Sequence, residues 1–225
     1  MTDLDKRVFG SLLWFFPLLA ALIFIPAGTL DYWQAWVFLA VYIVSSLAII
    51  FYLRRHDPQL LERRLHGGPG AEKEKTQKIV MSLISAAFIA LIVVPALDCR
   101  LEGPTVPPYV ALLGDALIAL TYLAFYFVFK ENSFASATIE FDPGQRVIST
   151  GPYALVRHPM YAGGLPMLVG IPLALGSWRG LLVLIPLLPV LVWRLLDEEQ
   201  LLAKNLPGYL AYKSKVKYRL IPFVW

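Results

Sequence analysis

Four hydrophobic segments of similar length constrain this chain more than any other feature. They cover residues 8–27, 33–53, 79–97 and 109–129, and each is close to the roughly 20 residues that an α-helix needs to cross a bilayer core. Hydrophobic residues make up 58% of the 225 residues, and the mean hydropathy is +0.63; both values exceed those of globular domains. The sequence therefore predicts an all-α, integral-membrane protein.

A fifth hydrophobic stretch, residues 160–196, is interrupted at residues 176–180 by Gly-Ser-Trp-Arg-Gly. Such an interruption is typical of a tight turn between two short helices. We therefore expect a polytopic transmembrane bundle of about six segments, the last two forming a short helical hairpin. Residues 1–130 would hold four transmembrane helices with a connector at 54–78, and residues 131–225 a second region with the hairpin and a tail.

The distribution of positive charge predicts the orientation. If six segments alternate from a cytoplasmic N-terminus, all but two of the 20 Lys and Arg residues lie on the cytoplasmic side, the exceptions being Arg100 and Arg179. Positively charged loops stay cytoplasmic, so both termini are expected there, in the inner membrane if the protein is bacterial. The net charge of +4 fits contact with anionic lipid. No basic patch interleaved with aromatic residues indicates nucleic-acid binding.

We do not expect a cleaved signal peptide, an internal disulfide or a structural metal site. The first segment is longer than the apolar region of a signal peptide and lacks a cleavage pattern, which predicts a retained helix. The single cysteine, Cys99, and three scattered histidines give neither an internal disulfide nor a metal site. In the connector, Asp57 and Pro58 predict the start of a short interfacial helix, and residues 72–78 read as a solvated run of charges. No oligomeric state is predicted.

Residues 151–163, Gly-Pro-Tyr-Ala-Leu-Val-Arg-His-Pro-Met-Tyr-Ala-Gly, gather aromatic and titratable side chains just before the hairpin. Proline disfavours the helical conformation at His158 and suits the first helical position itself, so a helix is predicted to begin at Pro159. Its first N–H groups and its dipole would favour an anionic group. Alternatively, the segment is a membrane-entry loop with interfacial anchors, although Tyr153 and Tyr161 could also stack on a heteroaromatic ring or a cation.

Arg194 and Glu198 are four residues apart at the end of the last hydrophobic segment, so they share one face of a helix. They could form a simple intrahelical ion pair. Alternatively, they belong to a functional site that includes the loop at Arg157, because ionisable side chains near lipid are costly unless they are paired or used.

The sequence from Ser149 to Phe223 resembles the C-terminal half of the isoprenylcysteine carboxyl methyltransferase and phospholipid methyltransferase superfamily, integral-membrane enzymes that use S-adenosylmethionine. The residues that carry the resemblance are Gly151-Pro152-Tyr153, Arg157-His158-Pro159-Met160-Tyr161 with Gly163, the pair Glu198-Glu199, Tyr209 with Tyr212, and Ile221-Pro222-Phe223. Two departures are a Leu206-Pro207-Gly208-Tyr209 segment one residue shorter than usual and Thr138 in place of a glutamine.

The resemblance implies a cytoplasmic C-terminal cofactor pocket and roles for individual residues. It implies cofactor contacts from Tyr153, His158, Pro159, Met160, Tyr161 and Glu198, with Gln145, Arg146, Val147 and Ile148 lining the same pocket. It assigns the catalytic positions to Arg194, Arg157 and Glu198, with Arg194 facing the substrate. Thr138 is a further possible contact.

The expected function is transfer of a methyl group from S-adenosylmethionine, leaving S-adenosylhomocysteine, to a lipophilic substrate that enters from the bilayer between the hairpin and the earlier spans. Arg194 favours a carboxylate, such as an isoprenylcysteine-like or isoprenoid acid, over an amine or a thiol. One alternative is an NADPH-dependent reductase of the sterol type, but those enzymes usually have Gly-Glu after the motif tyrosine, where this chain has Ala162-Gly163. Another is a non-enzymatic membrane scaffold.

Overall fold

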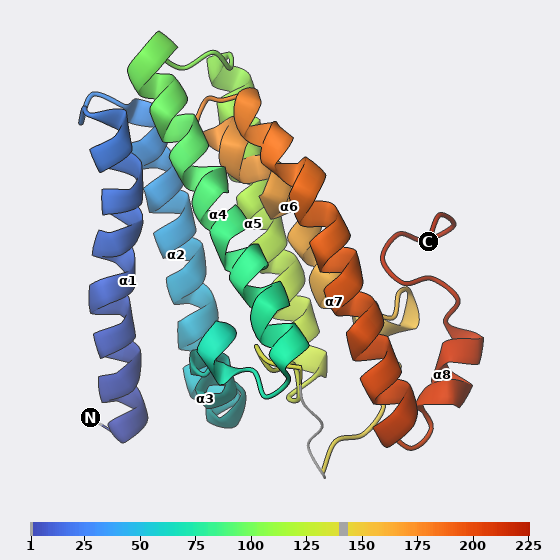
Figure 1. Cartoon of the computed structure of the whole chain (residues 1–225). Coiled ribbons are helices and arrows are strands. Elements are labelled where there is room, and N and C mark those ends of the chain that lie inside the picture. Colours follow the sequence, from blue (N-terminus) through green and yellow to red (C-terminus); the bar gives the residue numbers. More distant parts are fainter. Residues whose placement is uncertain (1, 140–143) are drawn as a thin grey trace. The chain divides into compact units, whose positions relative to one another are not determined.

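The computed structural model describes residues 2–139 and 144–225, and its regular elements are all helical. This confirms the predicted all-α class. The elements, shown in Figure 1, are α1 (Asp3–Ala27), α2 (Trp33–His56), α3 (Pro58–Leu65), η1 (Pro69–Ala71), α4 (Lys75–Glu102), α5 (Pro108–Glu131), η2 (Gly151–Ala154), α6 (Pro159–Ala174), η3 (Arg179–Val183), α7 (Leu184–Asn205) and α8 (Tyr209–Lys215).

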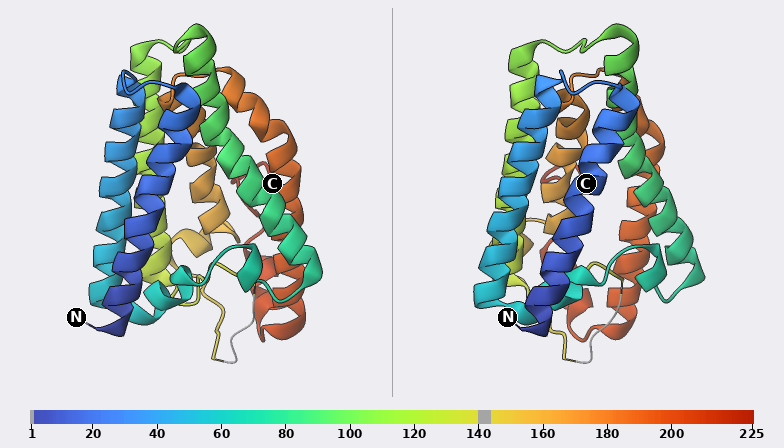
Figure 2. Two further views of the ribbon diagram at one scale, coloured as in Figure 1. Left: turned by 60° about the vertical axis from the view of Figure 1, so that its left-hand side comes forward. Right: turned by 90° about the vertical axis from the view of Figure 1, so that its left-hand side faces the viewer.

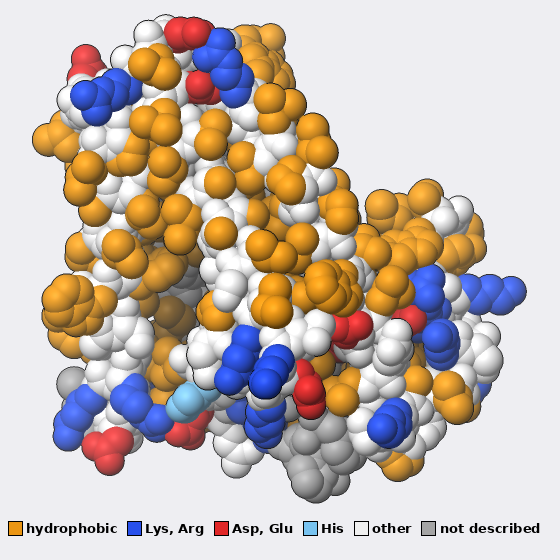
Figure 3. Space-filling view, in the orientation of Figure 1, with side chains coloured by type: hydrophobic (Ala, Val, Ile, Leu, Met, Phe, Trp, Pro, Cys, Tyr) orange, Lys and Arg blue, Asp and Glu red, His pale blue; other side chains and the backbone are white. Residues whose placement is uncertain are grey.

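Five helical segments of the described chain are long and apolar enough to cross a membrane, namely α1, α2, α4, α5 and residues Arg179–Asn205, which comprise η3 and α7. Helix α6, with 16 residues, is a shorter apolar helix. Of the two segments expected to be short, only α6 is, because the last one continues over 27 residues from Arg179 to Asn205. Large apolar side chains remain exposed along these helices, as Figure 3 shows; Trp14, for example, is 79% exposed. Such surfaces fit contact with lipid.

Local sequence signals account for the helix ends. At the start of α1, the Thr2 side chain accepts from the Asp5 N–H at 3.2 Å, and the Asp5 carboxylate accepts from the Thr2 N–H at 2.9 Å; this reciprocal pair is a capping box. The same helix ends at Gly28 with a φ of 68°, a conformation that glycine adopts without steric cost. Asp57 caps α3 by accepting from the Leu60 N–H at 2.9 Å, which confirms the predicted short helix in the connector; its interfacial position stays a prediction.

The described residues form two compact units, each assembled from separate stretches of the chain. Unit 1 comprises Met1–Ala48, Ala86–Ala119 and Pro166–Pro186, and unit 2 comprises Ile49–Ser85, Leu120–Leu165 and Leu187–Trp225. The functional division at residues 130 and 131 stays a prediction, because it concerns roles of segments rather than compactness.

Within unit 1, α5 and α6 touch through their backbones, and they run side by side in the views of Figure 2. A Cβ placed on Gly114 would lie 2.4 Å from the backbone N of Ala174, and one on Gly170 would lie 2.7 Å from the carbonyl of Gly114. Real Cβ atoms do not approach a backbone that closely, so both glycines are required for this contact. Small residues permit the same close approach in membrane helix pairs generally.

The predicted break between the last two segments is present in unit 1. Helix α6 ends at Ala174, Gly176 has a φ of 79°, and the Ser177 hydroxyl accepts from the Gly180 N–H at 2.9 Å. Arg179 forms ion pairs with Asp98 at 3.3 Å and with Glu102 at 2.9 Å. The turn is thus fixed by one glycine and by ionic contacts to α4.

Unit 2 holds most of the polar residues of the C-terminal half. A small apolar cluster of Leu206, Tyr209, Tyr212 and Val216, together with Val147, joins α8 to the loop that precedes the motif. After α8 the chain continues as a tail, residues 216–225, whose end is marked in Figure 1. This unit contains all of the residues assigned above to a cofactor or to catalysis.

Candidate active site

The motif segment follows the course that the His158-Pro159 pair predicts. The N–H of Arg157 donates to the Tyr218 carbonyl at 2.9 Å, and the N–H of His158 donates to the Arg219 carbonyl at 3.0 Å. Helix α6 then begins at Pro159. The C-terminal tail is therefore paired, backbone to backbone, with the two residues that precede the helix.

Glu199 lies at the centre of a cluster of positively charged and imidazole side chains. Its carboxylate lies 2.6 Å from the Nε of Arg157 and 3.1 Å from the Nε of Arg219. The His158 Nε2 and the Lys213 Nζ each lie 3.5 Å from it. Because the Arg157 and Glu199 side chains are both only 4% exposed, this cluster forms a buried connection between the motif, α7 and the tail.

Arg157 has further partners in the tail. Its Nη1 donates to the carbonyls of Val216 at 2.9 Å and Lys217 at 2.7 Å. With Glu199 on its Nε, the guanidinium thus contacts three acceptors from two segments. The structure brings Arg157 into the same unit as the other assigned residues, and its contacts suit a role in holding the tail and positioning its neighbours.

Glu198, the other member of the acidic pair, points elsewhere, since adjacent helical residues are about 100° apart around the axis. It accepts a hydrogen bond from the Tyr161 hydroxyl at 2.8 Å. The ring of Tyr161 lies edge-on to that of His158, with centroids 5.8 Å apart. Three residues assigned to the cofactor are therefore neighbours at the start of α6.

Tyr153 is held from two sides. Its hydroxyl accepts from the Asn132 Nδ2 at 2.7 Å, and its carbonyl accepts from the Tyr212 hydroxyl at 2.8 Å. Burial raises the pKa of Tyr153 to about 12, despite the opposing effect of the Asn132 hydrogen bond, and the nearby Glu198 charge raises it further. Tyr153 is thus a neutral phenol at physiological pH, suited to packing on a flat or cationic group.

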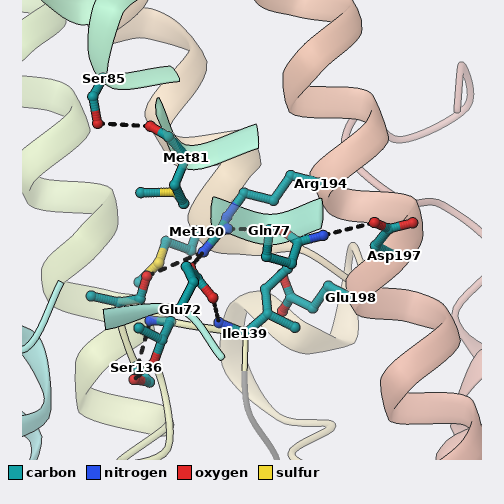
Figure 4. A network of polar contacts seen from close by, with 12 residues as sticks. Glu72, Gln77, Met81, Ser85, Ser136, Ile139, Met160, Arg194, Asp197 and Glu198 are labelled. Carbon is teal, nitrogen blue, oxygen red and sulfur yellow. Dashed lines mark hydrogen bonds and ion pairs between the residues drawn. The ribbon is translucent and has the colours of Figure 1, made fainter. Parts of the chain in front are cut away.

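Arg194 lies in a buried polar network that joins four segments of unit 2, drawn in Figure 4. Its Nη2 donates to Glu72 at 2.7 Å and to the Ala137 carbonyl at 3.2 Å, and its Nη1 donates to the Gln77 side chain at 3.0 Å. The Gln77 amide in turn donates to Asp197 at 2.7 Å. The whole guanidinium is thereby oriented.

This network corrects two expectations. Residues 72–78 are not uniformly solvated, because Glu72 and Gln77 are only 3% and 5% exposed. The intrahelical ion pair considered for Arg194 and Glu198 is also wrong, since Arg194 pairs with Glu72 and Glu198 bonds to Tyr161. The sequence around Glu72 does not indicate its burial, because its partner Arg194 lies 122 positions further along the chain.

Met160 and the loop residues contribute less polar contacts. The Arg64 Nη1 lies 3.5 Å from the Met160 sulfur and 3.3 Å from the Ser136 carbonyl. Burial lowers the pKa of Arg64 to about 10, which leaves it charged at neutral pH.

The predicted pocket-lining residues lie in the loop after residue 143. Of these, Val147 packs on the α8 cluster, Gln145 and Ile148 are half-buried, and Arg146 is exposed.

Two buried polar atoms in this region lack hydrogen-bond partners among the described residues. They are the His158 Nε2, which lies near Glu199 without hydrogen-bond geometry, and the Tyr209 hydroxyl. Burial also raises the pKa of Tyr209. Buried polar groups are usually paired, so these atoms are candidate contacts for a bound group. The first N–H groups of α6, which have no intrahelical partners, add donors at the same end of that helix.

Comparison with known proteins shows a similarity between this region and one family. Residues 109–207 match the model of the phospholipid methyltransferase family, which belongs to the superfamily expected from the motif residues. The match includes all of α6 and α7, and therefore Arg194 and the Glu198-Glu199 pair. No curated protein matches the chain.

Proposed function

Starting from this match of residues 109–207 to the phospholipid methyltransferase family, we propose that the chain is a membrane enzyme that methylates a lipophilic substrate with S-adenosylmethionine. The observation that supports this most is the contact of Tyr161 with Glu198 beside His158. It joins the Arg-His-Pro-Met-Tyr motif on α6 to the acidic pair on α7, and both lie within the matched residues.

The side chains available there fit the cofactor's chemistry. Glu198 presents a carboxylate whose contact is a neutral phenol, so it can accept from an ammonium or a hydroxyl group. The first turn of α6, at Met160 and Tyr161, can hold a carboxylate through backbone N–H groups. Tyr153 offers an aromatic surface, and the buried His158 Nε2 offers a polar contact. When bound, S-adenosylmethionine supplies a methyl group activated on a sulfonium.

The protein's own contribution would be positioning and exclusion of water, because methyl transfer is an in-line displacement that depends on the approach of two groups. A carboxylate substrate needs no proton removed, whereas an amine would require a base. Arg194 is buried and oriented by Gln77 and the Ala137 carbonyl, and its guanidinium already holds a carboxylate, that of Glu72. These contacts support a lipophilic carboxylic acid as the substrate.

The membrane placement is part of the proposal. The cofactor would reach unit 2 from the cytoplasm, where the distribution of Lys and Arg predicts both termini, and the substrate would enter from the bilayer. A soluble cofactor and a lipid-soluble substrate can then meet at the end of the membrane helices.

Calorimetric titration of the detergent-purified protein with S-adenosylhomocysteine, and separately with NADPH, tests the proposal. Saturable binding of the former, weakened about tenfold or more by Glu198→Gln through loss of a charged contact, is expected. Lys204→Ala, an exposed change on the same helix, should leave binding unchanged. Binding of NADPH alone would instead indicate the reductase, and binding of neither would favour a scaffold.

A further inference from the structure

Glu72 occupies the place on Arg194 that a substrate carboxylate would need. Its Oε1 lies 2.7 Å from the Arg194 Nη2, and the two side chains are 1% and 7% exposed, respectively. The other oxygen, Oε2, accepts from the Ile139 N–H at 3.3 Å. The pair is therefore complete without a ligand, and the charge of Arg194 is balanced by the protein itself.

We propose that Glu72 is an exchangeable internal carboxylate, which holds Arg194 while the site is empty and gives way to the carboxylate of the substrate. This inference rests on the function proposed above. It assigns to Glu72 a role in specificity, because the residue would decide which class of lipophilic molecule can gain access to the guanidinium.

Charge balance at Arg194 would select for a substrate that carries a carboxylate. Removing one partner of a buried ion pair is strongly unfavourable, because the remaining charge is left desolvated and unpaired. A substrate carboxylate that replaces Glu72 restores the pair and keeps the net charge of the site unchanged. A neutral alcohol of the same chain length cannot restore it, and an amine would place a second positive charge beside Arg194.

The position of Glu72 permits the exchange. It lies in the connector between α3 and α4, just after Gly68 and Gly70, and nothing lies within 4 Å of where a Cβ on either glycine would be. The next residues, Lys73 and Glu74, are exposed. A small rotation of this segment would bring the Glu72 carboxylate into water, where solvation replaces the ion pair.

Arg194 keeps its orientation during such an exchange. Gln77 comes from the first turns of α4, and the Ala137 carbonyl comes from the loop after α5, so both acceptors lie outside the glycine-containing segment. Figure 4 shows the Arg194 side chain between Gln77 and Glu72. The guanidinium would thus stay in place for an incoming carboxylate.

Binding of a C15 isoprenoid carboxylic acid to the full-length protein, compared with the matching C15 alcohol, tests the proposal without requiring turnover. Glu72→Gln keeps the size of the side chain but removes the competing charge, so it should bind the acid about tenfold more tightly and the alcohol unchanged. Glu74→Gln, an exposed change two residues away, should match the wild type for both ligands. Equal or weaker acid binding by Glu72→Gln, or acid binding by no variant, would overturn the proposal.

A second measurement keeps Glu72 and reports movement of the connector by fluorescence. It remains informative if Glu72→Gln unfolds the protein. Glu74→Cys in a Cys99→Ser background, where it is the only cysteine, can carry an environment-sensitive fluorophore. The acid should change its emission saturably and the alcohol should not; no difference between them contradicts the exchange. Binding of S-adenosylhomocysteine is measured separately. If the protein binds this molecule but shows no exchange, the proposed role of Glu72 is contradicted and the proposed function is not.

Discussion

The Arg157 Nε lies 2.6 Å from the Glu199 Oε1, and both side chains are 4% exposed. Together with the contacts of Arg157 to the carbonyls of Val216 and Lys217, this ion pair fastens the C-terminal tail to the segment that starts α6. The same segment presents Tyr161 to Glu198, so the two adjacent glutamates have different partners.

Replacing Glu199 with Gln should destabilise the protein strongly. Removing one partner of a buried ion pair typically costs about 3–5 kcal/mol, and here Arg157 and Arg219 would both lose their carboxylate. Thermal unfolding in detergent would show a large drop in Tm, whereas Lys215→Ala on the exposed face of α8 should show none. An unchanged Tm for Glu199→Gln would refute the structural role.

Tyr161→Phe should separate ligand binding from stability. It removes the hydroxyl that donates to Glu198 at 2.8 Å and keeps the ring, so the free energy of unfolding should change by only about 1 kcal/mol. Binding of S-adenosylhomocysteine should weaken several-fold, because Glu198 loses the contact that orients it. Wild-type affinity in this variant would argue against Glu198 as a cofactor contact.

Gly114→Ala should disrupt the contact of α5 with α6 inside unit 1. The new Cβ would lie 2.4 Å from the Ala174 backbone N, and backbone cannot move aside as a flexible side chain can, so a marked fall in Tm is expected. Gly10→Ala is the matched control, because it lies within α1 with nothing within 4 Å of its Cβ position. That change should be neutral or slightly stabilising, since alanine favours helix by about 1 kcal/mol over glycine.

Asp115→Leu should raise the stability of unit 1. Asp115 is 5% exposed, and neither carboxyl oxygen has a hydrogen-bond partner among the described residues. Leaving such a group unsatisfied costs about 1–3 kcal/mol, which a leucine, with its similarly branched apolar side chain, would avoid. A lower Tm, or loss of ligand binding, would show instead that Asp115 serves a contact within or beyond the chain.

Local signals predicted much of the fold. The lengths of the hydrophobic segments predict the long helices, and Pro159 predicts the start of α6. The glycine-containing break at residues 176–180 predicts the turn that follows α6. Each depends on residues that are neighbours in sequence, so a single sequence is sufficient. The short length of α6 relative to the other spans also follows from its spacing between Pro159 and Gly176.

The site was predicted only in part, because its remaining contacts join distant segments. The motif and the acidic pair identified Tyr161 and Glu198, but the two glutamates have different partners, which sequence adjacency hides. The sequence predicts a role for Arg194, whereas its partner Glu72 lies 122 positions away in a stretch with the composition of an ordinary charged connector. Such pairs become visible only when the chain is folded.

The most direct test of the central claim is methyl transfer by the purified full-length protein. It would be incubated with S-adenosylmethionine carrying a labelled methyl group and with a C15 isoprenoid acid, amine or thiol. We predict label in the acid alone, released as methanol by alkali because the product is an ester, and abolished by Arg194→Ala while S-adenosylhomocysteine still binds. Label in none of the three substrates, or alkali-stable label in the amine or thiol, would contradict the account.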